Sequence, residues 1–228
     1  MIKKRHWDSE FFDLCIGELY TTNKTVFEEL LTIGDAYDLV YIHSQEELAF
    51  NTNSFPAYVK LLFEKELIES DYSINKIISL DHSVHSSQYE ALLALAFSSG
   101  QHSRFKVDDR FGGPRFKLLY KLWLDNSLSR SFALDLLAHS DDNLIDGFVT
   151  LAHVDLNTAA IGLIAVHENA RGKGIGGALL KAASNLAITK GYKYLQVATQ
   201  EDNLAAVVFY EHNGFNAKSK TYTYHYWR

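Results

Sequence analysis

The sequence predicts an α/β protein built on a mixed sheet, and two observations carry this prediction. After about residue 87, apolar runs typical of strands alternate with runs whose apolar residues recur at helical spacing. Two short polar turns, at 141–143 and 155–157, separate three successive strand runs and suit β-hairpins. Strands joined by hairpins and strands separated by helices therefore both occur in one chain.

The first 85 residues are expected to form a smaller N-terminal α/β domain, 1–85. Short helices are predicted at 25–34 and 45–50, and strands at Leu39–Ile42 and Tyr58–Lys65. The polar stretch from Asp81 to Ser87 is the best candidate for a linker, so a second domain is expected to cover 86–228.

The second domain starts with two predicted helices, the second of which has Pro114 in its first turn, where proline is tolerated. Strands, a glycine-rich loop and further helices follow. The predicted elements are helices at 87–98 and 114–128, strands near 131–139, 146–154 and 159–166, a helix through 178–188, a strand at 194–198, a helix from 203 and a last strand near 219–227.

Composition is that of a soluble globular protein, with 228 residues, 47% hydrophobic and 22% charged. A formal net charge of −6 argues against a nucleic-acid partner, and Cys15, the single cysteine, excludes an intrachain disulfide. No apolar run is long enough for a membrane span, and the basic start has no apolar region after it, so neither a signal peptide nor a membrane partner is expected. The expected location is the cytoplasm.

The segment Arg171–Gly177 is the most informative part of the chain, because it joins the apolar run 159–166 to a helix-forming run. A helix start presents unpaired N–H groups and the positive end of the helix dipole. Glycines let a ligand approach that backbone, and Arg171 and Lys173 add two cations. Together these features predict a phosphate-binding site.

Four interpretations of this loop compete. A nucleotide P-loop fails, because Ala178 and Leu179 stand where its Lys and Ser or Thr are needed. The dinucleotide pattern G-x-G-x-x-G is met by Gly172, Gly174 and Gly177, but the polar segment 167–171 separates the strand from the first glycine. A merely tight loop is the third interpretation. The fourth is Arg-x-x-Gly-x-Gly, met by Arg171, Gly174 and Gly176, which resembles the coenzyme A pyrophosphate loop of the GCN5-related N-acetyltransferases (GNAT).

A second motif lies about 30 residues downstream. The segment from Asn203 to Phe215 has the pattern Asn-x-x-Ala-x-x-Phe-Tyr followed by Asn-Gly-Phe, and it resembles the last helix of the same family. A core aromatic is the alternative role for Tyr210. The predicted order from residue 87 also resembles the GNAT fold. Shorter signatures resemble the bacterial dTDP-fucosamine acetyltransferases, at 7–12, 103–111, 119–123 and 222–227.

That resemblance implies an enzyme of cell-surface polysaccharide biosynthesis that acetylates the amine of a nucleotide-linked 4-amino-4,6-dideoxy sugar. Acetyl-CoA is the implied co-substrate, without a metal. Tyr210 would protonate the leaving thiolate, and its usual pKa of about 10 suits that role. The implied acetyl-CoA-binding residues are Ile164, Ala165, Val166, Arg171, Gly172, Lys173, Gly174, Ile175, Gly176, Gly177 and Asn203.

The acceptor site is less defined by the sequence. Trp7 and Phe12 could shape a sugar pocket or belong to the core, and Arg104 and Arg110 could bind a diphosphate or be surface cations. A general base is not identifiable, and water could serve instead. The histidines and carboxylates considered for the base are His139, His153, Glu168 and Glu201.

Two other functions stay open at this point. One is a GNAT acetyltransferase for another small amine or a protein N-terminus, which the N-terminal and Ser103–Phe105 signatures disfavour. The other is a noncatalytic acyl-CoA-binding regulator, which the intact Asn203 and Tyr210 disfavour. A homodimer is among the expected assemblies.

Overall fold

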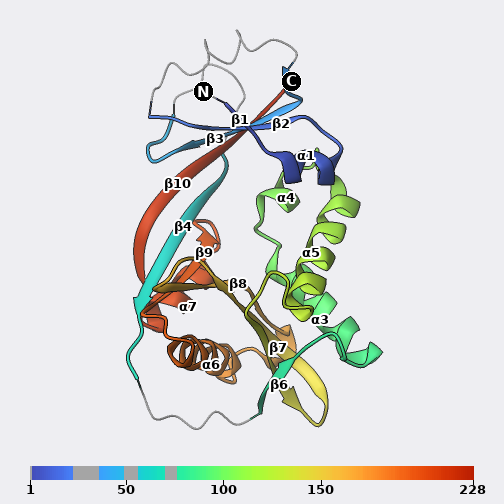
Figure 1. The fold of residues 1–228 in the computed structure, drawn as a ribbon, viewed down its shortest axis with the longest axis vertical. Helices are drawn as coiled ribbons and strands as arrows, with labels where there is room; N and C mark the ends of the chain where they lie inside the picture. Colours follow the sequence, from blue (N-terminus) through green and yellow to red (C-terminus); the bar gives the residue numbers. More distant parts are fainter. Residues whose placement is uncertain (1, 23–35, 49–55, 70–75) are drawn as a thin grey trace.

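The computed structural model describes residues 2–22, 36–48, 56–69 and 76–228, and the strands in these ranges form one ten-stranded mixed sheet (Figure 1). Its strand order is β1-β2-β3-β10-β4-β9-β8-β7-β6-β5. The strands are β1 Lys3–Lys4, β2 Ile16–Tyr20, β3 Leu39–Ser44, β4 Pro56–Glu66, β5 Ile77–Leu80, β6 Asp135–Asp141, β7 Leu144–His153, β8 Thr158–Val166, β9 Tyr194–Gln200 and β10 Asn216–Trp227. The pairs β2–β3 and β8–β9 are parallel and the other neighbours are antiparallel, so the predicted α/β class is confirmed.

Helices cover both faces of this sheet, with α6 and α7 on one side of β7–β9 and α3 and α5 on the other (Figure 1). Strand residues alternate between the two cores, as the pleat requires. In β6, Leu136 and Ala138 pack into the core under α3 and α5, whereas Leu137 packs into the core under α6. The helical elements are α1 His6–Phe12, α3 Ser86–Ser99, α4 Arg104–Val107, α5 Gly112–Leu128, the 3-10 helix η2 Glu168–Ala170, α6 Ile175–Thr189 and α7 Leu204–His212.

Strands from the first 85 residues are built into the same sheet as those that follow. β4 lies between β9 and β10, and β3 pairs with the other edge of β10. β5 adds an edge strand to β6. Strands on both sides of residue 85 therefore pair with each other. The division into two domains at that residue stays a prediction.

The predicted elements from residue 86 onward are confirmed, and the linker contains the start of α3 at Ser86. The helix expected at 45–50 is wrong over 45–48, where the chain bends without helical structure. The N–H of Glu46 donates to Ser44 Oγ (3.1 Å) and that of Leu48 to Tyr224 Oη (2.8 Å), so two side-chain acceptors hold this segment in its non-helical conformation. The helix expected at 25–34 lies outside the described residues.

Pairing between β8 and β9 stops partway along both strands. The parallel register runs from Thr158–Tyr194 to Ile161–Val197, although β8 continues to Val166 and β9 to Gln200. Each strand remains paired on its other side, β8 with β7 and β9 with β4. The two strands therefore diverge toward their carboxyl ends.

A bulge in β8 accompanies this divergence. Between the pairs Val149–Ile164 and Leu151–Ile161, β8 has one residue more than β7. The buried Thr150 faces the extra residue, and its Oγ1 accepts the N–H of Leu163 at 2.8 Å. A Cβ at Gly162 would lie 2.9 Å from that oxygen, so the bulge needs glycine there.

None of the helices within the described ranges is long and apolar enough to cross a bilayer.

Replacing Thr150 with Val should weaken the bulge, because the buried N–H of Leu163 would lose its acceptor while the side-chain shape is kept. An unpaired buried donor costs about 1–3 kcal/mol, so the free energy of unfolding should fall by that amount in urea titration. Thr150→Ser keeps the hydroxyl and should lose less. If the valine variant is as stable as the wild type, the hydroxyl does not hold the bulge.

Candidate functional site

The loop before α6 forms an open anion cradle. Gly172 and Gly174 have φ of +76° and +79°, a conformation that favours glycine, and Gly174 is the N-cap of α6. No described side chain caps this helix and no acidic residue lies in its first turn. A Cβ built on Gly172 or Gly174 would meet no atom within 4 Å, so the outer face of the loop is accessible. The free N–H groups of the first turn therefore fit a phosphate group.

Gly176 serves packing and not loop conformation. A Cβ there would lie 3.0 Å from the ring of Phe209, so glycine allows α7 to pack closely against the first turn of α6. Arg171 fastens the loop to the sheet, since its Nε donates to the carbonyl of Val166 at 3.1 Å. The loop, the end of β8 and the start of α7 thus form one continuous surface.

Two adjoining cavities lie on this surface. The first, which we call the loop cavity, has a volume of about 850 Å³ and extends over the loop, the end of β8 and the exposed side of α7. The second, the inner cavity, has a volume of about 520 Å³ and reaches between β8 and β9 toward α1 and α4. Seven residues line both: Ser98, His102, Ile164, Val166, Arg171, Asn203 and Ala206.

Tyr210 lines the inner cavity from α7 and is only 4% exposed. Its ring packs near Phe63, Phe209 and Phe215, while its hydroxyl has no hydrogen-bond partner among the described residues. Burial raises the pKa of this phenol above its usual value. The hydroxyl is therefore a protonated donor with no internal acceptor.

Asn203 stands at the boundary of the two cavities and is the N-cap of α7. Its Oδ1 accepts the N–H of Ala206 at 3.2 Å, which stabilises the helix start. The side-chain amide group remains as a donor toward the cavities. A structural role and a binding role are thus combined in this residue.

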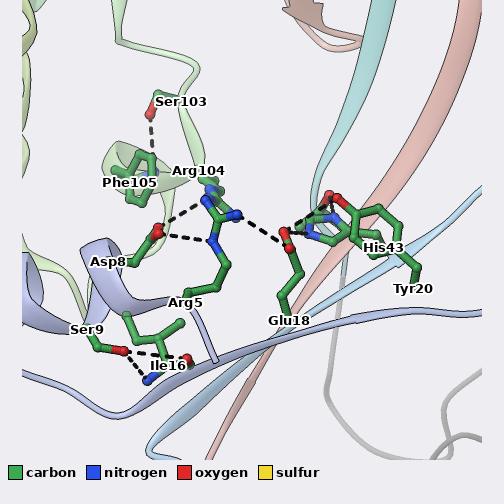
Figure 2. A network of polar contacts seen from close by, with 11 residues as sticks. Arg5, Asp8, Ser9, Ile16, Glu18, Tyr20, His43, Ser103, Arg104 and Phe105 are labelled. Atoms are coloured by element: carbon green, nitrogen blue, oxygen red, sulfur yellow. Dashed lines mark hydrogen bonds and ion pairs between the residues drawn. The ribbon is translucent and has the colours of Figure 1, made fainter. Parts of the chain in front are cut away.

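A polar network closes the far side of the inner cavity (Figure 2). Arg5 lies between two carboxylates, with Nε 3.1 Å from Asp8 and Nη1 3.4 Å from Glu18. Glu18 also contacts His43 Nε2 at 3.1 Å, and burial, together with the charge of Arg104, lowers the pKa of His43 to about 4 against the effect of Glu18. The imidazole is therefore neutral at pH 7, and the positive charge of the network belongs to its arginines.

Arg104 is the most enclosed cation in this network. Its guanidinium lies 4.0 Å from the ring centre of Tyr41 and 4.5 Å from that of Phe105, and Nη2 is 4.0 Å from Asp8. The buried Nη1 has no hydrogen-bond partner among the residues that the structure describes. Among the described residues, four cations line the inner cavity, Arg5, Lys60, Arg104 and Arg171, against the single carboxylate of Asp8. The described lining is therefore suited to an anionic ligand.

The structure brings together most of the residues that the sequence predicted. Ile164, Ala165, Val166, Asn203, Tyr210, Trp7 and Arg104 line the inner cavity, and Arg171, Gly172, Gly174, Ile175, Gly176 and Gly177 line the loop cavity. Lys173 is exposed on the same loop without lining either cavity.

Two predicted acceptor residues lie elsewhere. Phe12 is fully buried against Phe105 and Phe111, so it belongs to the core and has no surface for a substrate. Arg110 is exposed, and its guanidinium lies 5.7 Å from the ring of Trp227. It lines neither cavity.

The residues considered for a general base also lie outside both cavities. His139 Nδ1 is 2.5 Å from Asp146, His153 contacts the hydroxyl of Tyr192 at 2.9 Å, and Glu201 pairs with Lys220 at 2.6 Å. Glu168 is exposed in η2. Among the described residues, no group of three or more His, Cys, Asp or Glu side chains is placed to hold a metal ion.

Sequence patterns missed several cavity residues, namely Arg5, Asp8, Tyr58, Lys60 and His102. They come from α1, β4 and the turn after α3, which only the tertiary fold brings to β8 and β9. Polar residues at the end of a predicted helix were the only signal for His102, and that signal is not specific.

Comparison with known proteins supports this geometry. The model of the acetyltransferase (GNAT) family matches residues 99–215. A dTDP-fucosamine acetyltransferase of Escherichia coli O6:H1 is 36% identical over 139 residues, covering 58% of this chain and 56% of that protein. The spore coat polysaccharide biosynthesis protein SpsD of Bacillus subtilis is 28% identical over 138 residues, covering 60% and 47%. The chain thus spans about half the length of the curated relatives it matches.

Solved structures share the fold. A GNAT acetyltransferase from Colwellia psychrerythraea superposes with a TM-score of 0.58 at 14% identity, covering 89% of this chain and 72% of the other. The PaiA N-acetyltransferase from Thermoplasma acidophilum, solved in complex with coenzyme A, gives a TM-score of 0.51 at 21% identity, covering 67% and 99%.

The family match covers more than half of the 228 residues and includes the glycine loop, both diverging strands and Tyr210. The expectation drawn from the two sequence motifs is confirmed, and the chain belongs to the acetyltransferase (GNAT) family.

Proposed function

We propose that this protein transfers the acetyl group of acetyl-CoA to the amine of a nucleotide-linked amino-deoxy sugar, with a dTDP-4-amino-4,6-dideoxyhexose as the expected acceptor. The observation that carries the proposal is the pair of adjoining cavities. One lies on an uncapped helix start, and the other combines an excess of cations with the free hydroxyl of Tyr210.

The loop cavity is suited to acetyl-CoA, which supplies the activated acetyl group. Its pyrophosphate would accept hydrogen bonds from the N–H groups of 172–177, and Arg171 and Lys173 add positive charge. The pantetheine arm would extend along Ile164–Val166, where β8 is paired with β7 but no longer with β9, and past the side-chain amide of Asn203. The coenzyme A complex of the PaiA relative supports this choice of ligand.

Tyr210 would act as the general acid. Attack of the amine on the thioester carbonyl expels a thiolate, which needs a proton. Tyr210 lines the inner cavity, and its hydroxyl has no acceptor among the described residues and a raised pKa, so it stays protonated at neutral pH. This feature favours an enzyme over a noncatalytic acyl-CoA-binding regulator.

The inner cavity would hold the acceptor. Arg5, Lys60 and Arg104 match the negative charge of a nucleotide diphosphate, and the exposed ring of Trp7 gives a flat apolar surface at the same cavity. The names of the two curated relatives, a dTDP-fucosamine acetyltransferase and a spore coat polysaccharide biosynthesis protein, support a sugar acceptor over another small amine or a protein N-terminus.

Substitution of Gly174 by Ala tests the cradle. The new methyl group would stand on the open face of the loop, so the Kd for coenzyme A measured by calorimetry should rise by about tenfold or more. Left-handed backbone at a non-glycine residue also costs about 1–2 kcal/mol of stability. Gly191→Ala is the matched control, since Gly191 has φ of +88° and open space beyond the opposite end of α6. Equal affinities in the two variants would remove the loop from the site.

Tyr210→Phe tests the general acid. The variant loses a hydroxyl that has no described partner, so the fold should be kept while kcat falls roughly 10²- to 10⁴-fold. The KM for acetyl-CoA should change little. Tyr192→Phe removes a hydroxyl that contacts His153 outside both cavities, and it should keep the wild-type kcat. Full activity in a folded Tyr210→Phe variant would assign Tyr210 to the core alone.

Arg104→Met tests the acceptor class. Loss of a charged contact to a diphosphate, worth about 1.5–3 kcal/mol, should raise the KM for a dTDP-amino sugar about 10- to 100-fold. The KM for the same sugar without its nucleotide should stay nearly constant, because that acceptor carries no diphosphate. Arg110→Met, on the exposed side, is the control for general charge loss. An equal effect on both acceptors would contradict a diphosphate contact.

A further inference from the structure

The place where the two cavities meet defines where the amine must lose its proton. If the loop cavity takes the donor and the inner cavity takes the acceptor, as in the proposed function, the reacting atoms meet among the seven shared residues. Only two of these have titratable side chains, His102 and Arg171. An arginine stays protonated in proteins, so His102 is the shared side chain with a ring nitrogen that can accept a proton.

We propose that His102 is the general base that deprotonates the acceptor amine, with Asp202 as its positioning residue. The inference rests on the proposed function, and it assigns the base that the sequence left open. Its geometric basis is the lining of both cavities by His102, together with a distance of 3.6 Å between His102 Nδ1 and Asp202 Oδ2.

The turn that carries His102 is held firmly. The N–H of Ser103 donates to the carbonyl of Gly100 at 2.9 Å, and Ser103 Oγ accepts the N–H of Phe105 at 3.2 Å to cap α4. A Cβ at Gly100 would lie 2.3 Å from the ring of Tyr120, so this turn packs directly on α5. The backbone at His102 is therefore held in place, while the side chain is 43% exposed and in contact with water.

Asp202 reaches His102 from a different part of the fold. It immediately precedes the N-cap of α7, the helix that carries Tyr210. A carboxylate beside Nδ1 favours the tautomer with a proton on that nitrogen, which leaves Nε2 as the acceptor.

The surrounding charges are mainly positive and favour return of the proton to solvent. The charged or titratable groups that line the cavities around His102 are Arg5 and Asp8 near α1, Tyr58 and Lys60 of β4, Arg104 of α4, Tyr120 of α5, Arg171 of the loop, and Tyr210 and His212 of α7.

Asp8 is the other candidate acceptor, but it lines the inner cavity alone. Its carboxylate is 4% exposed and lies between Arg5 (3.1 Å) and Arg104 (4.0 Å). Its carboxylate is therefore already paired with two guanidiniums, and it does not line the loop cavity, where the donor would lie.

The groups named above account for every proton in the reaction. One ammonium proton passes to His102 Nε2 and then to solvent. The free amine forms the new C–N bond, the C–S bond breaks, and the Tyr210 hydroxyl proton goes to sulfur. The second nitrogen proton then restores Tyr210, so the net products are the amide, the thiol of coenzyme A and one proton.

The test compares kcat/KM for the acceptor between pH 6 and pH 9.5 in the wild type and in His102→Gln. A general base contributes roughly 10²-fold or more, so a loss of about that size is expected at pH 7. The loss should shrink at least several-fold by pH 9.5, where the amine is already unprotonated in solution. Asp202→Asn should show a smaller loss with the same pH trend. His153→Gln, the same change outside both cavities, should match the wild type.

The acceptor panel holds dTDP- and UDP-amino sugars, the free amino sugars and spermidine. If only spermidine or a free sugar is acetylated by the wild type, the proposed acceptor is wrong, and His102 is tested with the acceptor that works. A His102→Gln loss that is equal at every pH, or no loss at all, overturns the base assignment. A wild type that acetylates no amine in the panel contradicts both proposals.

Discussion

Between β8 and β9, pairing ends at Ile161 and Val197 although both strands continue, and each is held on its other side by β7 or β4. Neither strand can move to close the gap without losing its own pairing. Backbone polar groups along the gap therefore have no strand partner in the described sheet, and they need water or a ligand. The bulge at Gly162, held by Thr150, sets the point from which β8 turns away.

The rest of the site is arranged around this divergence. The loop at 171–177 follows the free end of β8, and α7 follows the free end of β9, so the anion cradle and Tyr210 stand on opposite sides of one opening. Close packing of Gly176 against Phe209 fixes the distance between them. The first 85 residues complete the enclosure, because β4 borders β9 and α1 supplies the Asp8 and Arg5 end of the inner cavity.

Local chemistry explains which parts of this arrangement the sequence predicted. The cradle depends on glycines at positive φ and on an uncapped helix start, and both are properties of consecutive residues. Hairpins and helices after residue 86 were likewise predicted from periodicity and turn composition. The helix expected at 45–50 is absent over 45–48, where the N–H of Leu48 instead donates to Tyr224, a partner 176 residues away that no local pattern reveals.

The residues predicted for the acceptor site show more clearly what local sequence patterns cannot reveal. Trp7 and Phe12 belong to one short helix, yet Trp7 is exposed at the inner cavity and Phe12 is buried in the core, and only the packing of α1 decides between them. Arg104 and Arg110 lie six positions apart, but α4 turns the first toward Tyr41 and leaves the second outside. His102 had no distinguishing pattern at all, because its importance comes from the meeting of two cavities.

Hydrogen exchange, followed by mass spectrometry with and without acetyl-CoA, tests most directly that the divergence and the loop hold the donor. The account predicts slower exchange of the amides of Ile164 and Val166 and of those at 172–177 when acetyl-CoA is added, because these groups gain hydrogen-bond partners. Little change is expected in β7, which is already paired on both sides. Binding of acetyl-CoA without slower exchange at 172–177 would contradict the account.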